Sequence, residues 1–520
     1  MPSFDTIVIG GGTNGLAAAG RLAKAGQKVV VLETRHRAGG GADRREFAKG
    51  YWVDSVAHLL TALDPRVEKE LALASHGLRY VTTSMPTTAL CANGDHLVLQ
   101  GAYGETVSGV FAPTEAAAWQ ELRARLLRYA AILRPFKSMT PPRLQENTGS
   151  QLMQLAKHGL KLRMLGRDDM QDFLRMLLIN VADVLDDELA DDRLKGLIAH
   201  DTVLGAYLGP RSPNSLLLLL NRLAGEMNGV PGAICLPNGG VSTVADAMVK
   251  ALESLGVEIR PFATVKSIVV KNDKAVGVIG HKGEIIAAQR VVSAVNPWTT
   301  FHALLDRCHL DTGFSRRVDS IRMRGSTAKL HLALTGPPDF RNADLKSRLV
   351  IAPSIRKVED AFNYIKYGEF SPEPIVEIIL PTAFGPGDAP QNHHVLSAIV
   401  QYVPFQVQGG WLREKPRLLR AIMSQLEAYA PGISKLVAKS ELLTPEDLQN
   451  QFGFRRGCWH HGDFAVEQML FLRPFPGAAQ YETPIANLYL ASAGCHPGGG
   501  ISGSAGWNAA TRILQVEGRQ

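Results

Sequence analysis

The feature that most constrains this chain is a glycine loop close to its first residue. The apolar run Thr6–Ile9 leads straight into Gly10–Gly15, which has the spacing G-x-G-x-x-G. An Ala-rich stretch follows, and a second apolar run, Lys28–Leu32, ends at Glu33. Strand, glycine turn, helix, strand and acid in this order are what a dinucleotide-binding βαβ unit requires. The sequence therefore predicts an α/β fold that begins with a Rossmann-like unit.

Each glycine of the loop has an expected role. Gly10 permits the tight turn, Gly12 lets the backbone approach a pyrophosphate, and Gly15 lets the helix lie against the strand. Free N–H groups at the start of the helix attract phosphates, and Glu33 accepts hydrogen bonds from ribose hydroxyls. The loop on its own leaves NAD and FAD equally open, and a tight turn without a ligand is the structural alternative.

Size and charge narrow the class of protein. A chain of 520 residues exceeds what one hydrophobic core normally supports, so at least two structural units are expected. The net charge is +7, but 49 acidic residues are interspersed among 56 basic ones and no long basic run occurs. We therefore expect no nucleic-acid partner.

The cysteines and the start of the chain bear on metal binding and location. The five cysteines are far apart, so neither a metal site nor a disulfide framework is expected, and the set suits a reducing compartment. The first strand begins within a few residues of Met1, which leaves no room for a signal peptide. No apolar run approaches the roughly 18 residues of a membrane span. The expected location is the cytoplasm.

The pattern of strands and helices divides the chain into five parts. Residues 1–85, 232–300 and 455–520 are expected to form one nucleotide-binding domain assembled from three segments. Residues 86–231 form a mostly helical insertion that faces the substrate or a membrane, and residues 301–454 form an α+β substrate domain. The main strands expected in these parts are residues 265–270, 275–278, 290–294, 329–334, 395–400 and 487–491.

The residues after the acid favour one dinucleotide. Arg35 and the pair Gly39–Gly40 resemble the second half of the FAD signature of amine-oxidase-like and phytoene-desaturase-like flavoproteins. The resemblance implies non-covalent FAD, with the glycine pair beside its diphosphate. Many relatives carry an arginine where this chain has Gly41, so a side-chain phosphate contact would have to come from Arg44 or Arg45.

The end of the chain carries a more specific resemblance. The stretch Leu488–Gly503 is similar to the closing motif of the phytoene desaturase family. His461–Asp463 and Phe471–Pro474 are similar to the branch of that family named for a pyridine nucleotide-disulfide oxidoreductase domain. In the family the last loop approaches the flavin ring, where a helix N-terminus stabilises developing negative charge. The further cofactor contacts that the resemblance implies are made by Gly494, Gly500, Ile501, Ser502 and, beside the adenine, Val265.

The expected reaction is the transfer of hydride from a substrate C–H bond to flavin N5. The substrate is an apolar or amphipathic small molecule, and oxygen or a quinone takes the electrons. A flavin amine oxidase, a saturase or isomerase, and a non-catalytic FAD-binding interaction protein stay open as alternatives. A disulfide reductase is not expected, because the chain lacks a redox C-x-x-C pair and a second glycine loop for NAD(P)H.

Candidate catalytic side chains are few. His496 lies in the loop that the resemblance brings to the flavin and could act as a base or orient the substrate. A hydrogen bond to a neighbouring carbonyl is the structural alternative for His496. His461, beside His460 and Asp463, is the second candidate, and His58 could line the same pocket.

The helical insertion contains one stretch with a basic face. Between residues 152 and 164, four basic side chains stand among Leu and Met: Lys157, His158, Lys161 and Arg163. Basic and apolar faces on one helix are typical of peripheral membrane contact, which the desaturase-like resemblance also implies. A helix with its apolar face in the core and a solvated basic side is the alternative.

Overall fold

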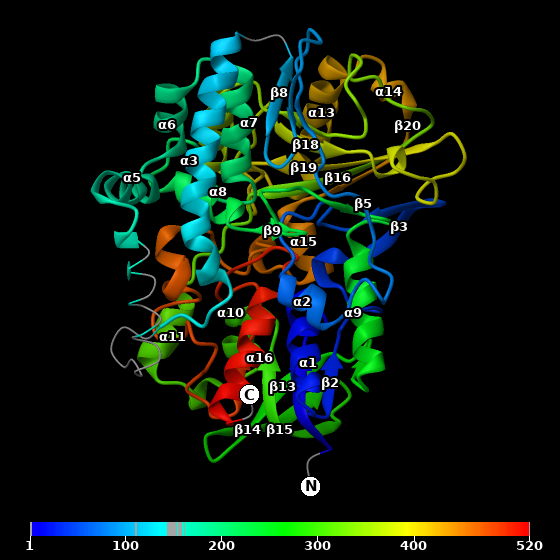
Figure 1. Cartoon of the computed structure of the whole chain (residues 1–520). Coiled ribbons are helices and arrows are strands. Elements are labelled where there is room, and N and C mark those ends of the chain that lie inside the picture. The colour runs from blue at the N-terminus through cyan, green and yellow to red at the C-terminus, as the bar shows by residue number, and fades with distance from the viewer. Residues whose placement is uncertain are drawn as a thin grey trace.

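The computed structural model describes residues 3–109, 112–142, 153, 156, 159–160 and 162–518. Two large sheets lie toward opposite ends of the molecule (Figure 1). One contains strands from both ends of the sequence, and the other contains strands from its middle. A group of helices from the first half of the chain lies along one side (Figure 1).

The first sheet has the strand order of a nucleotide-binding domain. Its five parallel strands run in the order β12-β2-β1-β15-β21, and β14 and β13 continue the sheet antiparallel from β15. The strands are β1 (Phe4–Ile9), β2 (Val29–Leu32), β12 (Glu258–Arg260), β13 (Val265–Lys271), β14 (Lys274–Gly280), β15 (Ile285–Ser293) and β21 (Leu488–Leu490). This is the doubly wound arrangement.

Strand β15 joins the parallel and the antiparallel part of this sheet because it is long enough to pair with strands of both parts. Its end, Val291–Ser293, pairs in parallel with β21, while Ile285–Ala287 pairs antiparallel with β14. The strands come from the first, second and third stretches of chain (residues 1–85, 232–300 and 455–520). The predicted assembly of one domain from three segments is therefore confirmed. Three helices lie side by side on the sheet with α1 in the middle (Figure 1): α1 (Thr13–Lys24), α9 (Ser242–Ser254) and α16 (Ser504–Val516).

The second sheet has eight strands in the order β20-β16-β19-β18-β17-β6-β7-β8. They are β20 (Val437–Leu443), β16 (Thr327–Leu334), β19 (His394–Gln401), β18 (Ile375–Ile379), β17 (Arg348–Ile351), β6 (Thr87–Ala89), β7 (Leu97–Gln100) and β8 (Thr106–Gly109). One face packs on α13 (Trp411–Tyr429) through Leu330, Leu332 and other buried apolar residues. The opposite face carries the polar side chains described below.

Two boundaries differ from those expected. Residues 87–109, which were expected to belong to the helical insertion, form β6, β7 and β8 of the second sheet. These strands are three or four residues long, too short for a periodic pattern, and β6 becomes a strand by pairing with the distant β17. Helices α10 (Pro297–His302) and α11 (Thr312–Asp319) pack into the core of the nucleotide-binding domain rather than the second sheet.

The helices of the insertion share one hydrophobic core. They are α3 (Pro113–Lys137), α5 (Arg167–Leu178), α6 (Val181–Glu188), α7 (Asp192–Val203) and α8 (Ser215–Leu223). Lys157, His158 and Lys161 of the predicted basic face lie outside the described residues. Among the residues that are described, no helix combines the length and the apolar character needed to cross a membrane.

Candidate active site

Two glycine segments lie against each other where β1 and β2 end. Gly12 and Gly39 form a parallel bridge, and the N–H of Gly39 donates to the carbonyl of Gly11 at 2.8 Å. Gly40 has a φ of +59°, and a Cβ on it would lie 3.0 Å from Cα of Gly12. A residue with a side chain would force the two segments apart, so the glycines make a cradle of bare backbone.

The starts of α1 and α16 meet beside this cradle. The N-cap residues of both helices are glycines, Gly12 and Gly503, so neither helix is capped by the side chain of its own N-cap residue. In the first turn of α16, Oγ of Ser502 accepts from the N–H of Ser504 at 3.3 Å. Oδ1 of Asn14 accepts from the N–H of Gly506 at 3.3 Å, which links the two helix starts. A Cβ on Gly15 would lie 2.0 Å from the carbonyl oxygen of Gly10, so only glycine lets α1 begin this close to the loop. The first N–H groups of a helix lack partners within it and carry the positive end of its dipole, which suits an anionic ligand.

The carboxylate of Glu33 is bound to both glycine segments. Its Oε2 accepts from the N–H of Gly11 at 2.7 Å, and its Oε1 accepts from the N–H of Arg35 at 2.8 Å. A carboxylate offers about four acceptor positions, so some remain for ligand hydroxyls. The guanidinium of Arg35 pairs with the buried Asp43 and donates to the carbonyl of Gly40 at 3.2 Å. Arg35 therefore holds the second glycine segment in place.

The second stretch of chain contacts the segment that contains Glu33 and Arg35. The N–H of Phe262 donates to the carbonyl of Arg35 at 3.0 Å, and that of Ala263 donates to the carbonyl of Glu33 at 2.8 Å. Val265, the first residue of β13, follows Ala263 by two positions. The contacts of Phe262 and Ala263 thus join the start of β13 to the segment that contains Glu33 and Arg35.

The third stretch reaches this region through the loop before α16. The carbonyl of Ser502 accepts from the N–H of Asp64 at 2.9 Å. Gly500 and Gly503 both have positive φ, and Ile501 packs against the core of the nucleotide-binding domain. Gly494, earlier in the loop, lies against Pro297, where a Cβ would come within 2.6 Å of the proline ring. All three stretches therefore contribute to one site.

Arg44 and Arg45 do not replace the arginine that is absent at Gly41. Arg44 pairs with Asp388 and its guanidinium lies over the ring of Trp52, and Arg45 pairs with Glu441. Both side chains are thus engaged in ion pairs outside the glycine cradle. The expectation of a substitute side-chain contact to phosphate from these two arginines was wrong.

His496 makes the carbonyl contact that was its structural alternative. Its Nε2 donates to the carbonyl of Phe136 at 2.6 Å, and the hydroxyl of Tyr481 donates to the carbonyl of His496 at 2.9 Å. Burial lowers the pKa of His496 to about 4, so the ring is neutral at pH 7. The backbone of Leu470 is a further contact of the ring.

His461 and His460 lie under the glycines of the C-terminal loop. A Cβ on Gly499 would lie 2.5 Å from Nδ1 of His460, and the ring centres of His461 and Phe454 are 6.1 Å apart. Burial lowers the pKa of His461 to about 4 and that of His460 well below its usual range. Nε2 of His460 accepts from Nε1–H of Trp459 at 2.9 Å. Both rings are therefore neutral.

A row of buried charged residues covers the polar face of the second sheet. Nζ of Lys329 lies 2.8 Å from Nδ1 of His58, whose Nε2 lies 2.9 Å from Oε1 of Glu377. Oε2 of Glu377 accepts from Nε of Arg348 at 2.7 Å, and Arg348 pairs with Asp201 at 2.5 Å. All five side chains are almost fully buried. His58 follows β4 (Tyr51–Asp54) and Asp201 lies on α7. The row therefore joins the nucleotide-binding domain, the helical insertion and the second sheet.

The row has a definite protonation pattern. Burial lowers the pKa of His58 to about 4, so Nε2–H donates to Glu377 and Nδ1 accepts from Lys329. Burial alone would raise the pKa of Glu377, but Arg348 and the neighbouring histidines hold it well below its usual range. Burial lowers the pKa of Lys329 to about 7. Lys329 can therefore take up or release a proton near neutral pH.

Lys329 lies in a strand that the sequence predicted, but no functional role was expected for it. A signal was present, because Lys329 and His331 stand at alternate positions of an apolar strand whose eight residues are all buried. Alternation places both on one face of the sheet. Polar residues on a buried face require partners, and those partners come from stretches far away in the sequence.

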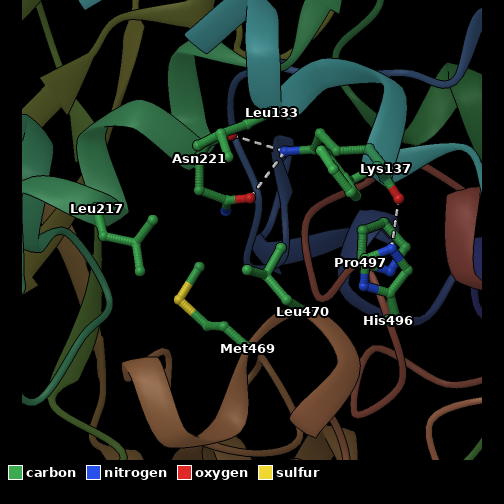
Figure 2. Close-up of a pocket in the computed structure, with 9 residues that line it drawn as sticks. Leu133, Lys137, Leu217, Asn221, Met469, Leu470, His496 and Pro497 are labelled. Atoms are coloured by element: carbon green, nitrogen blue, oxygen red, sulfur yellow. Dashed lines mark hydrogen bonds between the residues drawn. The ribbon is translucent and has the colours of Figure 1, made fainter. Parts of the chain in front are cut away.

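A small pocket lies against the C-terminal loop, between the end of α3 and α8 (Figure 2). Figure 2 shows Leu217, Met469 and Leu470 around it, with Lys137 directed at Asn221. None of the nine residues that line the pocket is acidic, and its charged member is a lysine.

The described residues give no indication of a metal site. They contain no group of three His, Cys, Asp or Glu side chains arranged to hold a metal ion. All five cysteines are described, and each is a free thiol.

Known proteins similar to this chain are flavoenzymes or their relatives. The family model described as flavin containing amine oxidoreductase matches residues 15–514. Pyridine nucleotide-disulfide oxidoreductase domain-containing protein 2 of Rattus norvegicus is 30% identical, over 99% of this chain and 94% of that protein. One component of the limonene dehydrogenase of Castellaniella defragrans is 24% identical, over 98% and 94%. The lycopene-forming phytoene desaturase of Pantoea ananas is 26% identical, over 98% and 99%. The expected resemblance to phytoene-desaturase-like flavoproteins is confirmed.

The fold is also that of solved amine oxidases. Cyclohexylamine oxidase from Brevibacterium oxydans superposes with a TM-score of 0.58 over 99% of this chain and 100% of that chain. The sequences are 17% identical, so this likeness concerns the fold alone.

Proposed function

The chain belongs to the family of flavin-containing amine oxidoreductases, and from that premise we propose that it dehydrogenates an apolar or amphipathic small molecule at a C–H bond. It is an FAD-dependent oxidoreductase that holds its FAD without a covalent bond. The bare-backbone cradle of Gly12 and Gly40 and the two helix starts, whose N-cap residues are glycines, fit a dinucleotide diphosphate. When bound, FAD supplies a hydride acceptor at N5 of its ring.

The residues that we propose to hold the cofactor come from all three stretches. They are Gly10, Gly12, Gly15, Glu33, Arg35, Gly39, Gly40, Val265, Gly494, Gly500, Ile501 and Ser502. The backbone N–H groups at the starts of α1 and α16 supply the positive potential that an arginine at position 41 supplies in many relatives. Arg35 acts indirectly, since its guanidinium braces Gly40 through the carbonyl contact and Asp43.

The observation that supports an apolar or amphipathic substrate is the character of the pocket beside the C-terminal loop. Its walls are mainly Leu, Met, Phe and Pro, and its one charged side chain is Lys137. A substrate amine is protonated near pH 7 and would meet an ammonium of the same sign with no acid in the pocket to balance it. A hydrocarbon segment meets no such penalty.

Chain residues would position the substrate and handle its proton. We propose that His496 and His461 face the reacting part of the substrate, because each is buried and neutral and lies in or against the C-terminal loop. Lys329 and His58 form a second place where a proton can be held, since the pKa of Lys329 is about 7. Oxygen or a quinone is the proposed electron acceptor.

A flavin amine oxidase is the second candidate, because the description of the matching family favours it. In that case the substrate is an amine that loses hydride from the carbon next to nitrogen and becomes an imine. A saturase or isomerase and a non-catalytic FAD-binding interaction protein are further alternatives. Each alternative predicts a different response of the flavin to a panel of candidate reductants.

Anaerobic reduction of the FAD-loaded protein tests the proposal. The panel contains terpenes and fatty acyl compounds, aliphatic amines, and NADPH, and the flavin absorbance is followed after rapid mixing. We expect bleaching by members of the first group and none by amines. Rapid reduction by NADPH alone, or by amines alone, would contradict C–H dehydrogenation of an apolar substrate, and a flavin that no compound reduces would indicate a non-catalytic protein.

Peripheral contact with a membrane is a separate part of the proposal. Among the described residues of the helical insertion, four apolar side chains are strongly exposed: Met153 at 62%, Leu160 at 59%, Met164 at 76% and Leu178 at 64%. Basic residues surround Leu160 and Met164 in the sequence. Exposed apolar groups next to basic ones are suited to an anionic bilayer surface. The proposed location is therefore the cytoplasm, at a membrane surface.

A further inference from the structure

Arg473 is a fully buried arginine whose hydrogen bonds, among the described residues, all go to backbone carbonyl groups. The residue is 1% exposed. Its guanidinium donates to the carbonyls of His460, Gly462, Asp463, Gln468 and Ala493. These oxygens satisfy the N–H groups of Arg473 but carry no full negative charge. Because a charge inside a protein normally has an ionised partner, the arrangement needs an explanation.

The buried acid of this segment, Asp463, is bound to a different arginine. Its Oδ1 accepts from the backbone N–H of Arg324 at 2.7 Å, and its Oδ2 accepts from Nε of Arg324 at 2.6 Å. One carboxylate therefore stands beside two guanidinium groups, and a net positive charge is left. Two thiols near Arg473, those of Cys458 and Cys495, do not offset it, since burial raises the pKa of each to about 11.

The other titratable groups around the C-terminal loop add to this positive charge or are neutral. Burial and the charge of Arg473 hold the pKa of His460, His461 and His496 below the usual range, so the three rings are uncharged at pH 7. Lys137, whose charge acts on His496, has a pKa that burial lowers to about 8. It is therefore mostly charged at pH 7, and the surroundings of the loop hold an excess of positive charge.

Arg473 lies directly against the C-terminal loop. Its Nε and Nη2 donate to the carbonyl of Ala493 at 3.3 Å and 2.9 Å, and a Cβ on Gly498 would lie 3.6 Å from Nε. The same loop leads into α16, whose start carries the positive end of a helix dipole. Charges in the interior act strongly because little solvent screens them. The loop therefore suits a group that becomes more negative during the reaction.

We propose that Arg473 raises the reduction potential of the bound FAD by stabilising the negative charge that the flavin ring gains on reduction. The inference rests on the proposed function, in which the ring lies at the loop that contains Gly494 and Gly500. A hydride brings two electrons and one proton to the ring, so one negative charge is left on it. The guanidinium is engaged by carbonyl groups, so Arg473 acts on the ring through space and is a tuning residue rather than a catalytic one.

The reduction potential of the FAD-loaded protein tests this inference without a substrate. It is measured at pH 7 in equilibrium with a dye of known potential. Arg473→Met should lower it by about 30 mV or more, because removing a unit charge from the interior changes the equilibrium by about tenfold or more, and tenfold is about 30 mV for two electrons. Arg473→Lys keeps the charge with fewer donors, so it should lose stability but keep the potential.

A second variant changes the charge in the opposite direction. Asp463→Asn has nearly the same shape and removes the buried negative charge, so it should raise the potential by about 30 mV or more, and it tests the inference even if Arg473→Met folds poorly. Arg123→Met is the matched control. Nε and Nη2 of Arg123 also donate to backbone carbonyls, but Arg123 lies about 21 Å along α3 from Lys137. The control should keep the potential of wild type.

The outcomes separate this inference from the proposed function. An unchanged potential in Arg473→Met or in Asp463→Asn would overturn the tuning role, and so would a fall in Arg473→Lys as large as that in Arg473→Met. If apolar compounds reduce the flavin but these variants leave the potential unchanged, the proposed function stands and the tuning role is rejected. If the potentials shift as expected but no apolar compound reduces the flavin, the tuning role stands and the proposed function fails.

Discussion

Lys329 and His58 share a hydrogen bond of 2.8 Å in the interior, although one lies on a strand of the second sheet and the other follows the strand pair after the nucleotide-binding glycines. The bond requires a neutral imidazole, and the contact of His58 with Glu377 fixes which nitrogen accepts. Because Lys329 itself is fully buried, its charge depends on pH near neutrality. The hydrogen bond therefore couples the protonation of Lys329, on the second sheet, to His58 of the nucleotide-binding domain.

The first prediction concerns stability and pH. Burial lowers the pKa of Lys329 from 10.5 to about 7. The unfolded chain therefore binds more protons than the folded one between these values, and stability rises with pH there. Lys329→Met should lose this rise. The free energy of unfolding of wild type minus that of the variant should therefore increase from pH 7 to pH 10 by up to about 4 kcal/mol. Urea unfolding at several pH values measures it.

Lys366→Met serves as the control for this series, since Lys366 is at the surface. The difference in free energy of unfolding between wild type and Lys366→Met should stay constant with pH. A constant difference for Lys329→Met as well would show that Lys329 keeps an ordinary pKa in the folded protein.

Glu377→Gln should be strongly destabilising. Glu377 is buried between Arg348 and His58, and the change leaves the guanidinium of Arg348 with less compensation. Removing one partner of a buried ion pair typically costs about 3–5 kcal/mol. Urea unfolding provides the measurement, with Glu373→Gln as the control. Glu373 pairs with Lys357 at the surface, so its loss should cost less than about 1 kcal/mol. Similar costs for the two variants would refute the importance of the buried row.

Gly15→Ala should weaken FAD binding. The added methyl group would lie 2.0 Å from the carbonyl oxygen of Gly10, so the loop and α1 must move apart. Overpacking of this kind costs about 1–3 kcal/mol, which corresponds to about tenfold or more in FAD affinity. Flavin content after dialysis and a titration with FAD measure the effect. Gly26→Ala, where a Cβ meets nothing within 4 Å, should retain FAD. Normal FAD affinity in Gly15→Ala would argue against this loop as the diphosphate site.

Two substitutions at His496 separate its structural contact from a role in catalysis. His496→Leu leaves the carbonyl of Phe136 without its donor and should cost about 1–3 kcal/mol of stability. His496→Gln can still donate from the position of Nε2, so it should keep most of the stability but lack the imidazole. If His496 faces the substrate, flavin reduction should be slow in both variants. A glutamine variant with normal reduction rates would leave His496 with the structural contact alone.

Membrane contact predicts a loss of vesicle binding when the exposed apolar side chains are replaced. Leu160→Glu with Met164→Glu should reduce co-sedimentation with vesicles that contain anionic lipid by about tenfold or more, since both apolar burial and charge attraction are lost. Leu412→Glu is the control, because Leu412 is 99% exposed on α13 and outside the helical insertion. Equal binding of both variants, or no binding of wild type, would reject this surface.

The sequence allowed correct predictions where a residue type is required by its immediate neighbours. Gly15 and Gly40 lie where another part of the backbone approaches so closely that a side chain would collide with it. The order of the glycine loops and Glu33 therefore predicted the nucleotide-binding domain and its three-segment assembly. The capping box at the start of α15 (Pro445–Phe452) is another local feature, because Thr444 and Asp447 each accept from the other's backbone N–H group.

Other features depend on partners that no local pattern identifies. Arg44 and Arg45 form ion pairs with Asp388 and Glu441, and the short strand β6 exists through its pairing with β17. By itself the sequence determined which cofactor fold this chain forms, because close backbone approach demands glycine at fixed spacing. Only the tertiary structure decided that Lys329 meets His58 and that Lys137 stands without an acidic partner among the described residues, because buried charges obtain their partners from packing between stretches far apart in the chain.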